Sequence, residues 1–499
     1  MLLPGAMHSP MLAVALMATT VVAQVHYHPD GQPWKQRARA GPDAEVPGWF
    51  YNLGLTGLRI ELVADEPKTM VVRHVFAKTP ASGKIEVGDV LLGVDGKAFA
   101  NAHQNGYGVK VFGARGPIEE FATALEASQT AAGKGRLRVT RRRGDEEREV
   151  QLTVGTQYGA FAPTFPSDCA KSERIRTELL QYLREHQGED GSFGNPVHDT
   201  FAPLALLAGG QARDLPAVER CARHLARVTS DRSQFSLINW NYMAAAIVLG
   251  EFYLATKQPW VQPELQQLYE LLTESQYMDM AQINPKSKQS HPSSFPKGPM
   301  DAHGGWGHNP GFEGYGPICM LTGQGALAFA LLQRCGIDVD RQRHDAAYAF
   351  LQRGTGPNGY VWYEDKVGDA KGWADPGRTG AAGIANWLAS YSEPAYHTRA
   401  VAHAKAIGDH PESFPDTHGS PVMGMAYAAL AAHVDPSSFR RLMDSNRWWF
   451  ALAQCADGTF YYQPNRDNAG YGADARMSAS AVVAFMLSIP RQSLAITRG

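Results

Sequence analysis

The C-terminal part of this chain alternates two kinds of helical segment, and this alternation limits the possible folds more than any other feature. One kind has an apolar stripe and a charged face, and the other is apolar or small nearly all round. A helix with one polar face lies at a surface, and a helix that is apolar all round is buried. The pattern predicts outer segments at residues 173–186, 214–228, 261–276, 340–353, 393–407 and 437–454, and inner segments at 200–207, 238–254, 317–333, 379–390, 420–432 and 477–487.

A turn recurs between these segments. Residues 187–193 and 454–460 both read Gln-x-x-Asp-Gly-(Ser/Thr)-Phe, with looser versions at Gly305-Trp306-Gly307 and Gly359-Tyr360. Internal recurrence is typical of repeat architectures. These turns resemble the Gln–Trp motif of the α/α toroids, a fold shared by terpenoid cyclases, protein prenyltransferase β subunits and many polysaccharide lyases and glycosidases. The resemblance covers residues 172–490 and implies an all-α (α/α)6 toroid.

The preceding residues, 48–155, read as a small β-rich domain. Gly54-Leu55-Thr56-Gly57-Leu58 and the run from Val87 to Lys97 resemble the carboxylate loop and core strand of bacterial secreted PDZ domains. The resemblance implies that Gly54, Leu55, Thr56, Gly57 and Leu58 hold the C-terminal carboxylate of a peptide with their backbone N–H groups. Alternatively, another part of the same protein fills this groove, and the module is a structural cap.

The N-terminus predicts export. Residues 1–23 lack Lys, Arg, Asp and Glu, and their apolar run ends in Val21-Val22-Ala23, which fits a signal peptidase site before Gln24. A buried N-terminal helix or a misplaced start codon is the alternative. The predicted organisation is therefore multidomain: signal peptide 1–23, N-terminal extension 24–47, PDZ-like domain 48–155, linker 156–171, toroid 172–490 and C-terminal tail 491–499. This arrangement resembles uncharacterised secreted bacterial proteins, and it predicts a secreted or periplasmic product without a membrane span.

Composition narrows the possible partners and cross-links. Lys+Arg number 47 and Asp+Glu 49, which gives no electrostatic reason to expect nucleic acid. The five cysteines are odd in number and widely spaced, so they form neither a disulfide framework nor a metal knuckle. Cys319 and Cys335 are expected on one helix about 24 Å apart, too far to pair with each other.

The inner helices of a toroid line a central cavity, and their N-termini converge at one end. Converging N-termini create a positive field that favours an anionic ligand. For each acid at these positions, an N-cap role is the alternative. The residues expected to bind the ligand are His198, Asp199, Trp240, His303, Trp306, His308 and Arg476. The long connection at 277–316 has no helical period and is a candidate lid.

The sequence lacks the motifs of several enzyme classes. There is no Asp-rich cyclase acid on an inner helix, no diphosphate–magnesium or zinc set, no Gly-x-Ser-x-Gly elbow and no phosphate loop. His303 and His308 could bind a metal with Asp301, but no cysteine or further helical histidine completes the set. We therefore expect neither a metal nor a cofactor.

A polysaccharide lyase needs a cationic or amide group to neutralise a uronate carboxylate, and a Tyr or His to move the proton. The residues of these types in the predicted cavity are His418, Tyr315, Arg378 and Asn241. The leading hypothesis is a lyase acting on an acidic glycan. A glycosidase with paired acids such as Asp199 and Asp375, and a non-catalytic binding or scaffold protein, are the alternatives.

Overall fold

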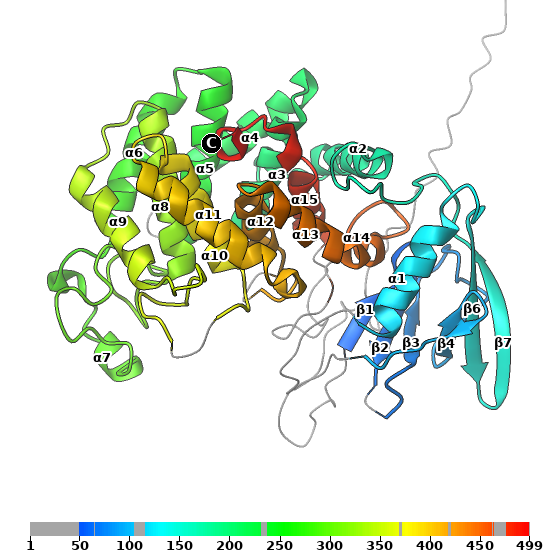
Figure 1. Ribbon diagram of the computed structural model, residues 1–499. Coiled ribbons are helices and arrows are strands. Elements are labelled where there is room, and N and C mark those ends of the chain that lie inside the picture. The colour runs from blue at the N-terminus through cyan, green and yellow to red at the C-terminus, as the bar shows by residue number, and fades with distance from the viewer. Residues whose placement is uncertain are drawn as a thin grey trace, which may run out of the picture.

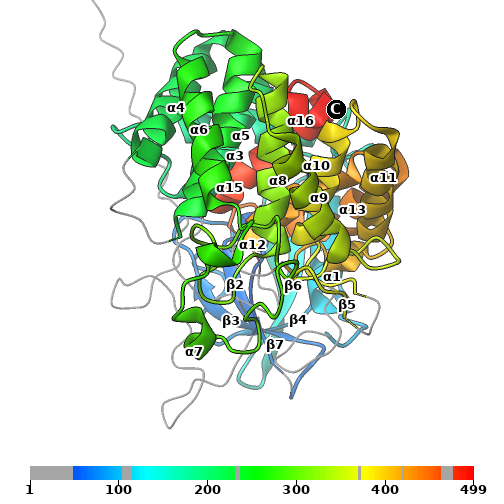
Figure 2. The same cartoon turned by 90° about the vertical axis from the view of Figure 1, so that its left-hand side faces the viewer.

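The computed structural model describes residues 49–63, 65–103, 115–230, 237–368, 372–417, 421–461, 463 and 476–498. The expected signal peptide and N-terminal extension lie outside these residues. A helical domain and a smaller sheet domain lie side by side (Figure 1), with the sheet below the helices in Figure 2.

The sheet domain is antiparallel throughout. Its strands follow the order β1-β2-β3-β4-β6-β7, and β5 pairs with β4. Helix α1, Pro117–Ser128, packs against β4 and β6. A tight turn at Asp95-Gly96 joins β4 to β5, with φ of 49° and 75°, as the two-residue hairpin turn requires. The strands are Trp49–Asn52 (β1), Leu58–Leu62 (β2), Met70–Val75 (β3), Val90–Val94 (β4), Lys97–Ala98 (β5), Arg136–Arg143 (β6) and Glu146–Thr153 (β7).

The helical domain is a closed ring of hairpins, which confirms the α/α toroid. Each inner helix contacts the next, and the last contacts the first. The inner helices are Pro196–Gly209 (α3), Ile238–Thr256 (α5), Cys319–Arg334 (α8), Gly377–Ala389 (α10), Pro421–Ala432 (α12) and Arg476–Met486 (α15). The outer helices are Ala170–Glu185 (α2), Leu215–Ser230 (α4), Val261–Ser275 (α6), Arg341–Arg353 (α9), Pro394–Gly408 (α11), Pro436–Ser445 (α13) and Arg447–Ala453 (α14).

The last outer segment, predicted as one helix over 437–454, is two helices. Between them, Asn446 adopts a non-helical conformation, and its side-chain amide donates to the carbonyls of Pro411 and Leu442 at 2.7 and 2.8 Å. An asparagine side chain that bonds nearby backbone competes with the helix. The chain therefore bends at Asn446, and α14 turns toward the sheet domain, where it contacts α1 and β1.

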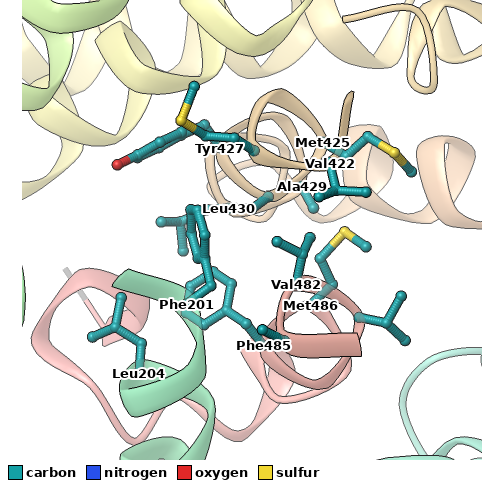
Figure 3. Close-up of a cluster of buried hydrophobic side chains, with 14 of the residues drawn as sticks. Phe201, Leu204, Val422, Met425, Tyr427, Ala429, Leu430, Val482, Phe485 and Met486 are labelled. Carbon is teal, nitrogen blue, oxygen red and sulfur yellow. The ribbon is translucent and has the colours of Figure 1, made fainter. Parts of the chain in front are cut away.

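Three neighbouring inner helices pack together through a cluster of buried side chains. Phe201 of α3 lies 5.6 Å from Tyr427 of α12 and 5.3 Å from Phe485 of α15, measured between ring centroids, and Figure 3 shows these side chains close together. Leu204, Leu430 and Met486 belong to the same buried cluster. These side chains hold α3, α12 and α15 together.

At two places the recurring turn ties one hairpin to the next. The Gln187 amide donates to the carbonyls of Gly191 and Ala217, both at 2.8 Å, and Ala217 belongs to the following outer helix. Gln276 makes the equivalent bonds to Gly304 and Arg343, both at 2.9 Å. Trp306, predicted to bind the ligand, is instead the buried aromatic of this second turn. Its indole N–H donates to the carbonyl of Leu272.

The residues expected as a free tail, 491–499, end in a short docked helix, Ala495–Arg498 (α16). Both carboxylate oxygens of Glu251 accept backbone N–H bonds, from Ala495 at 2.9 Å and Ile496 at 2.7 Å. Burial raises the pKa of Glu251 to about 7. All five cysteines are buried and free, so no disulfide holds the ring together.

The turn aromatics are a test of how the ring is held. Phe193 and Phe460 are 5% and 0% exposed, so Phe193→Ala or Phe460→Ala should lower the free energy of unfolding by roughly 3 to 5 kcal/mol, the usual range for truncating a buried Phe. Urea denaturation measures this. Val87→Ala, at a side chain that is 64% exposed, is the control. A loss below about 1 kcal/mol at both phenylalanines would contradict the packing described here.

Candidate functional site

A cavity of about 830 Å³ lies where the inner helices begin. Every inner helix contributes a residue of its first turn, so the six N-termini converge on it as the toroid resemblance implies. These residues are Val197 (α3), Trp240 (α5), Met320 (α8), Arg378 (α10), Met423 (α12) and Ser478 (α15). The lining also includes Asp190, Asp199, His224, Asn241, His308, Tyr315, Tyr363 and Asp375.

Tyr315 ends a directed chain of hydrogen bonds. The Trp240 indole donates to Nδ1 of His308 at 2.8 Å. Because an indole N–H only donates, Nδ1 carries no proton, and neutral His308 has its proton on Nε2, which lies within hydrogen-bond distance of the Tyr315 hydroxyl. Burial lowers the pKa of His308 and so favours this neutral form. Tyr315 therefore accepts a bond from a ring whose tautomer is fixed.

A second donor reaches the same oxygen. The Tyr363 hydroxyl donates to the Tyr315 hydroxyl at 3.2 Å. Burial, and then this bond to Tyr315, raise the pKa of Tyr363, so Tyr363 stays protonated and remains a donor. The Tyr315 oxygen is thus placed to accept two hydrogen bonds. Tyr363 was missed by the sequence analysis, since it lies three residues after the Gly359-Tyr360 turn and outside any inner helix.

Arg378 lies in the cavity wall, but its charge is already compensated. Its guanidinium donates to the Asp375 carboxylate at 2.5 Å and to the Tyr360 hydroxyl at 2.7 Å. Burial alone would lower the pKa of Arg378, yet Asp375 and Tyr360 more than offset it, and the pKa is raised. The expected role of Arg378 as a free cation for a substrate carboxylate therefore does not fit this geometry.

Asn241 remains as the amide of the expected catalytic set. It lines the cavity from the first turn of α5, and within the described part of the chain its side chain makes no hydrogen bond. A partly exposed amide at a cavity wall can bond a ligand without first breaking a protein contact. His418, the remaining candidate, lies outside the described residues.

Asp199 is a buried acceptor at the other side of the ring. Its carboxylate accepts bonds from the Phe193 N–H at 2.5 Å and the Ser192 hydroxyl at 2.9 Å. Burial raises the pKa of Asp199 although these bonds act in the opposite direction. Asp199 therefore organises the recurring turn at Phe193 and at the same time borders the cavity.

The other expected binding residues fall into two groups. His198 is not in the cavity lining. Its Nε2 forms a hydrogen bond with Ser478, and Ser478 does line the cavity. His303 is also outside the lining, and its carbonyl accepts from Arg353 at 2.8 Å. Arg476 pairs with Asp457 at 2.9 Å, away from the cavity. Among the described residues, no group of three or more His, Cys, Asp or Glu side chains could hold a metal ion.

The expected peptide-binding loop faces the toroid. Gly54, Leu55 and Thr56 are buried, and a Cβ on Gly54 would lie 2.5 Å from the carbonyl oxygen of Ala451 in α14. Strand β2, which would receive the peptide, already has β1 along one edge and β3 along the other. The edge used by a bound peptide is thus taken by the chain's own strand Trp49–Asn52.

Sequence comparison gives the family. Residues 172–498, more than half of the chain, match the family described as Domain of unknown function (DUF6288). The chain belongs to this family. No curated protein matches the sequence significantly. The DUF6288 region coincides with the helical ring, so the cavity and every residue lining it belong to this domain.

Solved structures of similar overall shape have low identity. The GH76A alpha-1,6-mannanase from Salegentibacter sp. HEL1_6 is 14% identical, with a TM-score of 0.46 over 64% of this chain and 99% of the mannanase. A D-mannose isomerase is 11% identical, with a TM-score of 0.43 over 66% and 99%. The type II terpene cyclase MstE from Scytonema is 13% identical, with a TM-score of 0.41 over 65% and 98%. The α/α toroid fold of the DUF6288 domain follows from its own closed ring of inner helices.

The ion pair between Arg378 and Asp375 leads to a prediction about stability. Arg378→Ala should lower the free energy of unfolding by about 3 kcal/mol, because it leaves the half-buried Asp375 carboxylate without its cation. Arg378→Ala combined with Asp375→Ala should recover much of that loss. Thermal and urea unfolding measure both. If Arg378→Ala alone leaves stability unchanged, the ion pair is not structural, and Arg378 is available to a ligand.

Proposed function

We propose that the cavity of the DUF6288 domain binds an acidic glycan and that Tyr315 is the proton-transfer group of a polysaccharide lyase. The observation that carries the proposal is the pair of donors, His308 Nε2–H and Tyr363 O–H, directed at the Tyr315 oxygen on the cavity wall. The six converging helix N-termini favour a carboxylate in the ligand. The positive field of these N-termini opposes the negative charge of the aspartates in the cavity lining.

In the proposed reaction, the Asn241 amide bonds the carboxylate of a uronate residue and stabilises the charge that builds on it. Tyr315, as phenolate, takes the proton from C5 of the sugar. The electron pair left at C5 forms a C4=C5 double bond as the C4–O bond breaks. The departing oxygen then takes the proton from Tyr315, which returns the phenolate. His308 and Tyr363 stabilise the phenolate at both ends of the cycle.

A glycosidase is the second candidate, and the raised pKa of Asp199 favours it. A general acid of a glycosidase needs a carboxyl group that stays protonated near neutral pH, and burial moves Asp199 in that direction. Asp375 would be the partner acid. Its bond to Arg378 makes it an acceptor rather than a proton donor. A non-catalytic glycan-binding role is the outcome if neither reaction occurs.

Tyr315→Phe separates these functions. The variant keeps the ring and removes the hydroxyl, so eliminative cleavage of hexuronate polymers should fall at least about 100-fold while the melting temperature changes little. The ultraviolet absorbance of the C4=C5 product measures the reaction. A carboxyl-reduced polymer, which cannot form the stabilised intermediate, is the substrate control, and Tyr391→Phe, at an exposed tyrosine, is the matched protein control.

The proposal fails if no unsaturated product forms from any hexuronate polymer tested. Release of reducing ends without that absorbance, lost in Asp199→Asn, would instead support the glycosidase. Binding without either product would support a scaffold role.

We further propose that the sheet domain is PDZ-like in ancestry and structural in use, and that the protein is exported after removal of residues 1–23. No helix among the described residues is long and apolar enough to cross a membrane. The buried loop at residues 54–58 and the occupied edge of β2 support the structural role. The uncharged apolar start of the sequence supports export.

Peptide binding tests the structural role. A library of peptides with free C-terminal carboxylates should show no binding to the full chain that is lost on C-terminal amidation, because β1 fills the edge of β2. Fluorescence anisotropy measures this. Carboxylate-dependent binding that is abolished by Gly57→Val would show instead that the loop opens to peptides.

A further inference from the structure

A serine and a histidine at the cavity share the geometry of a nucleophile and its base. His198 lies in the first turn of α3, and its Nδ1 is 2.9 Å from the carbonyl oxygen of Phe193. A carbonyl only accepts, so Nδ1 carries the proton and Nε2 presents a lone pair. The Ser478 hydroxyl lies within hydrogen-bond distance of Nε2 and donates to it. Burial lowers the pKa of His198, which keeps the ring in this neutral, basic form.

A third contact agrees with this tautomer. The side-chain amide of Asn195 is 3.2 Å from the same Nε2 and can only be a donor there, because its oxygen already accepts the N–H groups of Val197 and His198 as the N-cap of α3. Backbone and side-chain contacts therefore fix the imidazole in one orientation. Its basic nitrogen points at Ser478 on the neighbouring inner helix α15, which contacts α3 in the ring.

Ser478 differs from the hydroxyl groups that serve the helices of this domain. Thr200, Thr229 and Ser488 each donate to the carbonyl four residues earlier, the usual bond of a helical hydroxyl. Ser480, two residues further along α15, is fully buried and accepts the Phe460 N–H. Ser478 instead donates to an imidazole and lines the cavity.

We propose that Ser478 is the nucleophile and His198 the general base of an ester-cleaving site in this cavity. Ser478 Oγ attacks the ester carbonyl carbon as its proton passes to His198 Nε2, and the C–O bond to the alcohol breaks as His198 returns that proton to the departing oxygen. Water, activated by His198, then hydrolyses the acyl-serine and releases the carboxylic acid. The N–H groups in the first turn of α15 have no acceptor within their own helix and are the candidate donors to the oxyanion.

The surroundings indicate the class of ester. Val197 adjoins His198 on α3, Met423 lies on α12, the other neighbour of α15 in the ring, and Met320 lies on α8; all three line the cavity. Aliphatic and thioether side chains suit an alkyl chain, and the polar side chains of the same lining suit the hydroxyl groups of an alcohol. The substrate class is therefore a carboxylic ester with an apolar acyl group on a polar alcohol, such as an acylated sugar.

This site is separate from the proposed elimination. Around the ring of inner helices, the contact between α15 and α3 lies opposite the contact between α8 and α10. Tyr315, Tyr363 and Arg378 belong to the segments at the start of α8 and α10. Ester cleavage requires neither a uronate nor Tyr315. The two proposals can therefore fail independently, since one is read from unsaturated sugar and the other from a modified serine.

The first experiment uses the unmodified full chain and a fluorophosphonate probe, which reacts with activated serines. Mass spectrometry of the digested protein should place the adduct on Ser478, and p-nitrophenyl acetate, butyrate and octanoate should be hydrolysed above the buffer rate. The labelling rate should rise with pH as His198 loses its proton. An adduct at another residue, or no adduct and no hydrolysis, overturns the proposal without requiring any variant to fold.

Variants then separate catalysis from a structural bond between α3 and α15. Ser478→Ala and His198→Gln should each reduce hydrolysis at least about 100-fold, the usual contribution of general base catalysis, and His198→Gln should flatten the pH profile of labelling. Ser488→Ala removes a helix-bonded hydroxyl after the same helix and should change neither readout. If Ser478→Ala lowers the melting temperature but leaves hydrolysis unchanged, the bond is structural and the proposal is wrong.

Discussion

Two glutamine side chains, each held in a copy of the recurring turn, tie one hairpin of the ring to the next. Gln187 and Gln276 each bond the carbonyl of a glycine within their own turn and a carbonyl in the next outer helix. The glycine must come close in the first of these turns, since a Cβ on Gly191 would lie 2.4 Å from the Arg220 carbonyl oxygen. These two turns fix where the following hairpins begin, and the N-termini of the inner helices meet around one cavity.

The convergence of the inner-helix N-termini influences which ligands the cavity can bind. Helix N-termini supply a positive field without any charged side chain. Asp199 and Asp375 both line the cavity near these N-termini. Arg378 is then held by Asp375 rather than left for a ligand. The cavity lining also carries polar groups without a formal charge in their usual forms, among them the Asn241 amide and the Ser478 hydroxyl. The proposed reactions therefore depend on the positions of such groups more than on the net charge of the cavity.

The sequence predicts those features that leave a periodic pattern or a motif in neighbouring residues. The alternation of apolar and amphipathic segments predicts the ring, and the turn motif predicts buried Phe193 and Phe460. Contacts between distant residues leave no such signal. His198 and Ser478 are 280 residues apart, and their pairing follows only from the closure of α15 onto α3. Gln276 lies 28 residues before its glycine, because the long connection 277–316 interrupts the motif. Similarly, nothing local shows that Trp49–Asn52 folds back along β2.

Closure of the ring is the weakest point of a toroid, because its first and last hairpins are not consecutive in the chain. Here the sheet domain bridges them. Lys171 of α2 pairs with Glu126 of α1 and lies 4.4 Å from the centre of the Phe161 ring, while α1 also contacts α14.

On the side of the last hairpin, the Gln463 amide bonds both the N–H and the carbonyl of Asn52 at 2.9 Å, as a neighbouring strand would. Arg447 adds a bond to the carbonyl of Pro163 in the linker. The sheet domain thus contacts α14 and α2 from one side, and α2 in turn contacts α15 and α3, which carry Ser478 and His198. The sheet domain therefore contacts the ring beside the edge where the hydrogen bond between His198 and Ser478 joins two inner helices.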